Sequence, residues 1–188
     1  MEQMNQAYKV FTRICLNNWH YIDRKVLGLN ESINFFTGHS GSGKSTVIDA
    51  MQIVLYANTD GRGFFNKAAA DDSDRSLIEY LRGMINIGEN NQAEYKRNKN
   101  FSTTIVLEME QTITKEKECI GVVFDVETAT NEINRLFFWH KGELIPGDYR
   151  TESRAMTISE VRSYLQQNFP KDEMFYTSNN ERFRRNLY

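Results

Sequence analysis

The sequence predicts an α/β fold, on the evidence of three patterns along the 188-residue chain. Residues 32–37 are β-branched and aromatic, and they lead through a glycine-rich segment into the apolar residues 45–58. This order predicts a strand, a tight loop and a buried helix. Apolar and polar residues alternate through much of 103–140, which predicts antiparallel strands. With 40% apolar residues, the chain is long enough to form one domain with its own core.

The elements around this unit can be placed in order. Residues 8–16 alternate polar and apolar and predict a first strand, and residues 17–21 predict a turn that carries aromatic side chains. Acidic residues at 71–74 start a predicted helix that continues through 76–84. Its apolar face consists of Leu77, Ile78, Leu81 and Met84. The polar, Asn-rich residues 86–100 predict an exposed loop.

An antiparallel meander follows in the sequence. Its predicted strands span residues 103–110, 118–126 and 134–140, each with apolar side chains at every second position. Lys141 and Gly142 predict a turn into a short return strand, because glycine favours tight turns between strands.

The last part of the chain predicts two helices separated by a short extended segment. Thr157 and Glu160 have the spacing of a capping box, which opens a helix through Gln167. Residues 174–176 predict an extended piece, and residues 180–188 predict a further helix. We expect this helix to continue as a coiled coil that begins near or after residue 180, so that residues 1–188 form a single lobe of a longer protein.

The glycine-rich segment satisfies the phosphate-loop pattern G-x-x-x-x-G-K-[S/T] at every fixed position. It consists of Gly38, His39, Ser40, Gly41, Ser42, Gly43, Lys44 and Ser45. Glycines allow the backbone to direct several N–H groups at one phosphate, and the following helix adds its N-terminal dipole. Lys44, the predicted catalytic residue, adds positive charge near the β- and γ-phosphates, and the Ser45 hydroxyl is placed to bind Mg²⁺. The motif predicts a P-loop NTPase that binds ATP or GTP with Mg²⁺.

A P-loop ATPase also needs an acidic residue at the end of a hydrophobic strand, to hold Mg²⁺ and position the attacking water. The candidate is Asp125, but Glu127 follows one position too late and the run lies within the predicted meander. We therefore favour a solvated Asp125 on an ordinary edge strand over a catalytic one. The sequence also lacks the Leu-Ser-Gly-Gly signature of ATP-sandwich enzymes. We expect the isolated chain to be catalytically inactive.

Composition limits the other functions. The net charge of −2 gives no general indication of a nucleic-acid or anionic-membrane surface. Cys15 and Cys119 lack paired spacing, which indicates a reducing compartment rather than a disulfide framework. His20, His39 and His140 have no cysteine or carboxylate at metal-ligand spacing. The chain has no run of eighteen apolar residues and no signal-peptide pattern, so we expect a soluble, cytoplasmic protein without a membrane partner.

Two basic clusters are candidates for DNA contact. One is the run 96–99 in the polar segment, and the other consists of Arg182, Arg184 and Arg185 in the last predicted helix. Basic side chains make salt-dependent contacts with phosphates without reading the base sequence. Solvated surface charge is the favoured interpretation for each cluster.

The order of glycine loop, central helix, antiparallel strands and interrupted last helix resembles the N-terminal lobe of an ABC-type head. More narrowly, it resembles the structural-maintenance-of-chromosomes (SMC) group, which includes MukB. Residues 16–20, 33–50 and 58–69 are most similar to the MukB-like JetC subunits of Wadjet plasmid-defence condensins. In this group a long coiled coil separates the lobe that carries the phosphate loop from the lobe that carries the acidic and signature motifs.

The resemblance implies that ATP and Mg²⁺ join two heads and that hydrolysis separates them. The implied partners are the C-terminal head lobe of the same protein, a second SMC-like head, a kleisin, winged-helix and nuclease subunits, and DNA. The implied activity is DNA translocation or loop extrusion in plasmid defence.

The resemblance also assigns residues. Its phosphate and Mg²⁺ site maps onto Gly38, Gly41, Gly43, Lys44, Ser45 and Thr46. Arg62 stands at about the interval of the group's head arginine, which reaches toward nucleotide or DNA, and a solvated loop arginine is an equal alternative. Ser40 stands where many SMC heads have Asn. This serine makes the loop slightly more similar to that of transporters. The expected glutamine loop at 174–180 contains no Gln, so a second Mg²⁺ ligand is unassigned.

Two alternative functions stay open. The chain also fits the nucleotide-binding domain of an ABC transporter, which would carry its signature motif and acidic strand soon after residue 188. A non-hydrolysing DNA or protein docking module with a vestigial loop is the third possibility, although the intact glycines, Lys44 and Ser45 speak against it.

Overall fold

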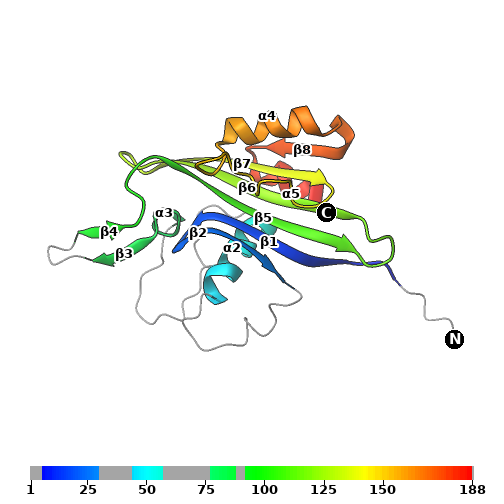
Figure 1. Ribbon diagram of the computed structural model, residues 1–188, viewed down its shortest axis with the longest axis horizontal. Coiled ribbons are helices and arrows are strands. Elements are labelled where there is room, and N and C mark those ends of the chain that lie inside the picture. Colours follow the sequence, from blue (N-terminus) through cyan, green and yellow to red (C-terminus); the bar gives the residue numbers. More distant parts are fainter. Residues whose placement is uncertain (1–5, 30–43, 57–76, 88–91, 188) are drawn as a thin grey trace.

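The computed structural model describes residues 6–29, 44–56, 77–87 and 92–187 (Figure 1). Six strands form one sheet in which every neighbouring pair is antiparallel, in the order β2-β1-β5-β6-β7-β8. The strands are β1 (Lys9–Trp19), β2 (Ile22–Gly28), β5 (Phe101–Gln111), β6 (Lys117–Glu127), β7 (Glu132–Lys141) and β8 (Met174–Thr177).

Helices cover both faces of this sheet, and a hairpin extends away from it (Figure 1). The helical elements are α2 (Lys44–Tyr56), α3 (Leu77–Arg82), α4 (Ile158–Asn168), the short 3₁₀ turn η1 (Lys171–Glu173) and α5 (Asn180–Leu187). The hairpin pairs β3 (Met84–Ile87) with β4 (Ala93–Tyr95). The observed architecture is thus a mixed α/β fold with a large antiparallel sheet, as predicted.

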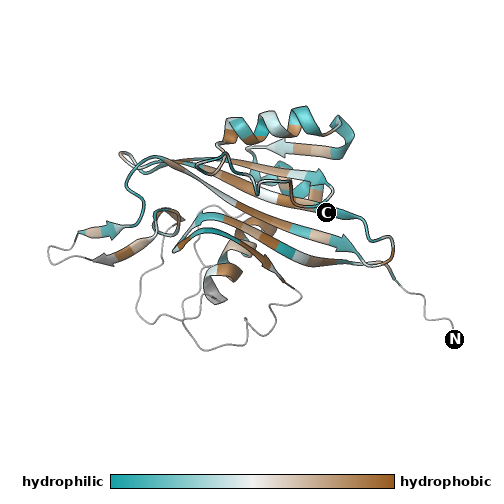
Figure 2. Cartoon of the chain, viewed as in Figure 1, coloured by the Kyte–Doolittle hydropathy of each residue, from teal (hydrophilic) through white to brown (hydrophobic). Residues whose placement is uncertain are grey.

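Alternation along the strands divides the core into two layers. Odd positions of β5 and even positions of β6 face α2 and α5, where Ile105, Leu107 and Val122 are fully buried. The intervening side chains face α4 and the segment 142–156, where Val106 and Val123 are buried. Hydrophobic residues accordingly concentrate on the middle of the sheet and on α2, whereas α4 carries mostly hydrophilic residues (Figure 2).

Several predicted elements are confirmed. The strands expected at 8–16, 103–110, 118–126 and 134–140 are β1, β5, β6 and β7, each slightly longer than predicted. The buried helix expected at 45–58 is α2. The strand expected at 32–37 and the helix start at 71–74 lie outside the described residues.

The C-terminal elements are also confirmed. Thr157 caps α4 with both bonds of the capping box, since its hydroxyl accepts from the Glu160 amide and the Glu160 carboxylate accepts from the Thr157 amide. The predicted extended piece is β8, which pairs with β7, and the last predicted helix is α5.

The turn predicted at 17–21 is wrong in extent, and β2 was not predicted at all. β1 continues through Trp19, and only His20 and Tyr21 separate it from β2. β2 carries a charged, exposed run, Asp23 to Lys25, which hides the alternation that marks the other strands. Backbone pairing with β1 forms this strand in spite of its polar sequence.

The return strand predicted after Gly142 is also wrong. Residues 143–156 cross the outer face of the sheet instead, with Leu144 and Tyr149 buried against it. Asp148 and Tyr149 have positive φ angles of 56° and 60°, which lie outside the β region that regular strands occupy. In this segment, burial of side chains replaces strand pairing.

The helix and loop predicted at 76–100 need correction. α3 ends at Arg82, because Gly83 adopts a φ of +66° that terminates the helix, and Met84 enters β3. A Cβ atom at Gly83 would lie 2.6 Å from the His20 carbonyl oxygen, so only glycine fits there. The polar segment 86–100 forms part of the β3–β4 hairpin rather than only a loop.

A buried ion pair ties β1, β5 and the crossing segment together. The Glu108 carboxylate is fully buried and accepts hydrogen bonds from Arg13 Nη2 at 2.6 Å, Thr12 Oγ1 at 2.8 Å and the Leu144 amide at 2.9 Å. Burial alone raises the pKa of Glu108, but the bonds from Arg13, Leu144 and Thr12 outweigh it and lower the pKa from 4.5 to about 2.

We predict that Glu108→Gln lowers the free energy of unfolding by about 3 kcal/mol at pH 7, because it leaves Arg13 without its buried counter-ion. The folded-state pKa lies below the unfolded one, so the carboxylate stabilises the protein above pH 4.5. This contribution is lost as the pH falls from 4.5 to about 2, and the difference between wild type and variant should shrink over that window. Urea unfolding at several pH values measures it. Glu110→Gln on the same strand is the control, and equal effects of both variants would contradict the prediction.

Candidate nucleotide-binding site

Of the predicted phosphate-loop motif, the structure describes the two last residues, which form the start of α2. α2 begins at Lys44, directly after the glycines, and Lys44 and Ser45 are described as backbone only. The remaining predicted site residues lie outside the described residues: Gly38, His39, Ser40, Gly41, Ser42, Gly43 and Arg62. Thr46, the third residue of α2, is the first with a described side chain.

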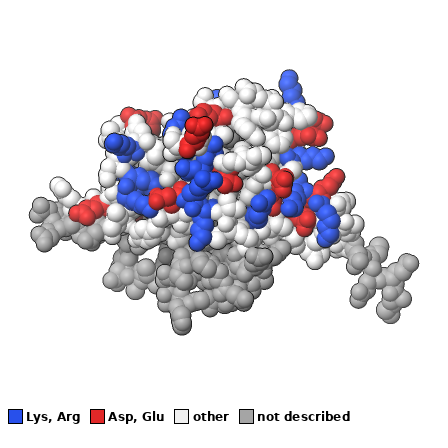
Figure 3. Space-filling view, in the orientation of Figure 1, with Lys and Arg blue, Asp and Glu red and all other residues white. Residues whose placement is uncertain are grey.

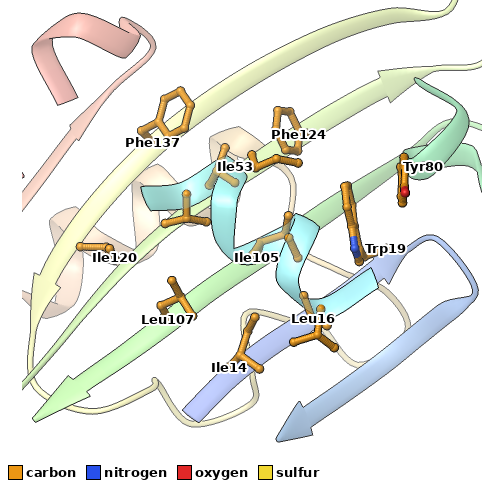
Figure 4. Close-up of a cluster of buried hydrophobic side chains, with 14 of the residues drawn as sticks. Ile14, Leu16, Trp19, Ile53, Tyr80, Ile105, Leu107, Ile120, Phe124 and Phe137 are labelled. Atoms are coloured by element: carbon orange, nitrogen blue, oxygen red, sulfur yellow. The ribbon is translucent and has the colours of Figure 1, made fainter. Parts of the chain in front are cut away.

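α2 packs against the sheet through its middle turns. Val47, Ala50, Ile53 and Val54 are buried, and they join a core that includes Phe124. Figure 4 shows α2 crossing the strands, with Trp19 and Tyr80 at one end of this cluster. The end with the two aromatic rings is the end at which the N-terminus of α2 lies, because Trp19 bonds to Thr46.

Trp19, the last residue of β1, makes a polar contact with the first turn of α2. Its indole Nε1 donates a hydrogen bond of 2.9 Å to the carbonyl oxygen of Thr46. The side chain is fully buried, so its N–H must find an acceptor within the protein. This bond fixes the distance between the end of β1 and the start of α2.

Tyr80 of α3 makes a second polar contact with α2. Its hydroxyl donates a 2.8 Å hydrogen bond to Oδ2 of Asp49, a carboxylate that is only 1% exposed. The Tyr80 ring stacks on Trp19, with ring centroids 5.1 Å apart and an interplanar angle of 16°. The two contacts therefore form one continuous cluster at the start of α2.

Trp19, Tyr80 and Asp49 were not predicted as site residues. A signal for Asp49 exists in the sequence, because it is the one acidic residue in the mainly apolar run 47–55. Trp19 and Tyr80 lie 27 and 31 residues from their α2 partners, so no local pattern connects them.

Arg97 anchors the same region from the hairpin side. Its guanidinium donates to the carbonyl oxygens of His20 and Leu81 at 2.8 and 2.9 Å and to that of Ile22 at 2.8 Å. It is 8% exposed, and burial lowers its pKa to about 10, so it stays charged at neutral pH. Arg97 therefore joins the β1–β2 turn, α3 and the hairpin.

Asp125, the weak candidate for the catalytic acid, has a structural role. Its Oδ1 accepts hydrogen bonds from Ser102 Oγ at 2.7 Å and from the amide of Ile158 at 3.1 Å, at the start of α4. These bonds agree with the expectation that Asp125 is not catalytic. The expectation of a solvated residue on an edge strand is wrong, because β6 lies between β5 and β7 and Asp125 is half-buried.

The segment expected to hold a glutamine loop is used to start α5. Asn179 Oδ1 accepts a hydrogen bond from the Arg182 amide at 2.9 Å, and the Asn179 amide donates to Thr177 Oγ1 at 3.1 Å. These bonds satisfy free backbone groups at the start of the helix. The segment therefore supplies a helix cap in the structure.

The two basic clusters differ in exposure. Arg97 of the first cluster is buried and bonded to backbone carbonyl groups, so it is not available for DNA contact. Arg182, Arg184 and Arg185 of α5 are exposed, although Arg182 lies over the Phe175 ring and Arg185 pairs with Glu181. On the face shown in Figure 3, Lys and Arg side chains are interspersed with Asp and Glu. Solvated charge remains the better interpretation of the α5 cluster.

The cysteines and histidines that the structure describes serve the core. Cys15 and Cys119 are buried free thiols, and burial raises the pKa of Cys15 to about 12. His140 Nε2 lies 2.6 Å from the Tyr149 hydroxyl, and burial lowers the pKa of this histidine. The described residues contain no cluster of His, Cys, Asp and Glu able to hold a metal ion. None of the helices described is both long and apolar enough to cross a membrane.

Comparison with protein families gives a match in the first part of the chain. Residues 11–72 match the family model described as the P-loop containing region of AAA domain. The matched residues include most of β1, all of β2, the phosphate-loop motif and all of α2. Among curated proteins, no sequence matches the chain. The match supports a P-loop nucleotide-binding region, and such regions usually bind Mg²⁺ together with the nucleotide.

We predict that Arg97→Ala lowers the free energy of unfolding by about 3 kcal/mol, because it leaves buried carbonyl groups without a charged donor. Thermal and urea unfolding measure this change. Arg184→Ala, at an exposed arginine of α5, is the control and should change stability by less than about 0.5 kcal/mol. A small effect of both variants would contradict the anchoring role of Arg97.

Proposed function

We propose that the chain is the ATP- and Mg²⁺-binding lobe of a split head of the ABC and SMC type. The observation that carries this proposal is the position of α2. α2 starts within the phosphate-loop motif, at Lys44, and its N-terminal end is held in place by Trp19 and Tyr80. A phosphate loop depends on such a helix start, because the first-turn N–H groups and the dipole favour an anion.

The residues around this helix start fit a bound nucleoside triphosphate. α2 has thirteen residues, so it is long enough to carry a full helix dipole at its N-terminus. Its apolar side chains are buried against the sheet. When bound, ATP would supply the triphosphate anion, and Mg²⁺ would offset part of its negative charge. The backbone of Gly38, Gly41 and Gly43 would hold the phosphates. Lys44 would balance their charge, and Ser45 would hold the Mg²⁺, with Thr46 among the residues that bind the nucleotide.

The finer assignment to a split head rests on the resemblance to SMC heads and on the structural role of Asp125. Asp125 is engaged in capping α4, so the acid that positions the attacking water would come from polypeptide outside residues 1–188. The C-terminal lobe of the same protein would supply it, and a second SMC-like head would supply the signature motif. ATP would favour the engaged pair of heads only through its higher affinity for that state.

The proposed cellular role extends this assignment. With a kleisin, winged-helix subunits and DNA, the full protein would use ATP to translocate DNA or extrude loops in plasmid defence. The support is the resemblance of residues 16–20, 33–50 and 58–69 to the JetC subunits.

We predict that the chain binds ATP with Mg²⁺ and that Lys44→Ala weakens this binding at least tenfold. The variant deletes hydrogen bonds to a charged phosphate, which contribute about 1.5–3 kcal/mol. Isothermal titration calorimetry measures both affinities, and Lys99→Ala, at an exposed lysine of the polar segment, is the matched control. No heat of binding with the wild-type chain, or equal affinities for wild type and Lys44→Ala, would contradict the proposal and favour a vestigial loop.

We also predict that the pure chain does not turn over ATP, because its proposed catalytic acid and signature motif belong to other polypeptide. A coupled phosphate-release assay measures turnover. Steady hydrolysis that Lys44→Ala abolishes would show that the chain carries a complete site, and would refute the split arrangement.

A further inference from the structure

We propose that Trp19, Tyr80 and Asp49 are positioning residues, which hold the first turn of α2 where the phosphates bind and thereby set the affinity for ATP. This inference rests on the proposed function. It concerns three side chains that the phosphate-loop motif does not include, and that lie on β1, α3 and α2.

The bond from Trp19 acts on the backbone of the site itself. Its acceptor, the Thr46 carbonyl, belongs to the residue that follows Ser45 and lies two positions after Lys44. A buried indole N–H needs an acceptor inside the protein, and here the acceptor belongs to the first turn of the helix. The position of that turn relative to β1 is therefore set by a bond whose length varies only between about 2.7 and 3.2 Å.

The bond from Tyr80 acts one turn further along α2. Asp49 lies four positions after Ser45, so a shift or rotation of the first turn moves its carboxylate as well. Loss of a hydrogen bond to a buried carboxylate is costly, which gives the Tyr80 contact a strong preference for one geometry. Because Trp19 and Tyr80 stack on each other, a displacement of one ring disturbs both bonds to α2.

Apolar packing alone would position α2 less sharply. The contacts of Val47, Ala50, Ile53 and Val54 are non-directional and tolerate small sliding movements. Phosphate binding needs the N–H groups within hydrogen-bond distance of the anion, and a displacement of about 1 Å can cost up to a hundredfold in function. The two polar contacts supply the direction that the apolar contacts lack.

The elements that carry these side chains are themselves held in place. The His20 amide donates a 2.8 Å hydrogen bond to the Tyr80 carbonyl, and Arg97 bonds to the carbonyl groups of His20 and Leu81. Trp19 and Tyr80 thus belong to one rigid unit made of the β1–β2 turn, α3 and the base of the hairpin. This unit acts as a fixed support for the start of α2.

Two conservative aromatic variants with matched controls test the inference. Trp19→Phe removes the indole donor and keeps an aromatic ring, and Tyr80→Phe removes only the hydroxyl. Their controls are Trp139→Phe and Tyr149→Phe, which delete comparable hydrogen bonds, to Glu118 and His140, away from the start of α2. For each protein, Mg²⁺–ATP affinity is measured by calorimetry and the melting temperature is measured without nucleotide.

We expect Trp19→Phe and Tyr80→Phe each to weaken ATP binding by about three- to tenfold, the loss of roughly one hydrogen bond. The controls should bind within twofold of wild type. A merely structural role would lower the melting temperature of Trp19→Phe and Tyr80→Phe without changing the affinity of the folded protein, and that result would overturn the inference. Failure of the wild-type chain to bind Mg²⁺–ATP, in contrast, would contradict the proposed function.

A spectroscopic measurement tests the same inference with both contacts intact. The sequence contains two tryptophans, so Trp19 is the only one in Trp139→Phe. Because its N–H is bonded to the first turn of α2, its fluorescence should shift as Mg²⁺–ATP binds, with the dissociation constant found by calorimetry. In the double variant with Lys44→Ala, the same shift should need at least tenfold more Mg²⁺–ATP. Emission of Trp19 that stays constant while calorimetry records binding would contradict the inference.

Discussion

A buried N–H group gives the contact between the sheet of this protein and its phosphate-loop helix a fixed geometry. The indole of Trp19 has no access to water and donates to the carbonyl of Thr46, so the last residue of β1 and the first turn of α2 cannot move independently. Tyr80 adds the contact with Asp49 from α3 and stacks on the same indole. The proposed chemistry depends on this constraint, because the start of the helix binds a phosphate only if it stays next to the phosphate loop.

The rest of the fold makes that constraint rigid. Both faces of the sheet are covered, by α2 and α5 on one side and by α4 with residues 142–156 on the other, so the strands under α2 are firmly packed. Glu108 fastens β5 to Arg13 of β1 and to the crossing segment through Leu144. Arg97 fastens the β1–β2 turn to α3. Charged groups are thus buried here to join elements that apolar contacts alone would leave free to slide. Glu108 is paired with Arg13, and the Arg97 guanidinium bonds to backbone carbonyl groups.

Much of this fold could be predicted from local patterns, and what could not depends on distant contacts. The two-residue period of β5 to β7 and the capping box of α4 are properties of neighbouring residues, and so is the apolar run of α2. β2 is hidden by the charges of Asp23 to Lys25, and it exists because β1 pairs with it. Arg97 and Asp125 are polar residues that ordinarily lie on the surface, and only the assembled structure buries the first and gives the second a helix to cap. For the site, the motif predicts which residues contact phosphate, but not the support formed by Trp19 and Tyr80.

A structure of the chain with Mg²⁺ and a non-hydrolysable ATP analogue is the most direct test of this account. We expect the triphosphate at the N-terminal end of α2, within hydrogen-bond distance of the backbone N–H groups of Lys44 and Ser45, with the Trp19–Thr46 bond retained. A nucleotide bound elsewhere on the molecule, or triphosphate at this position only after α2 has separated from Trp19 and Tyr80, would contradict it.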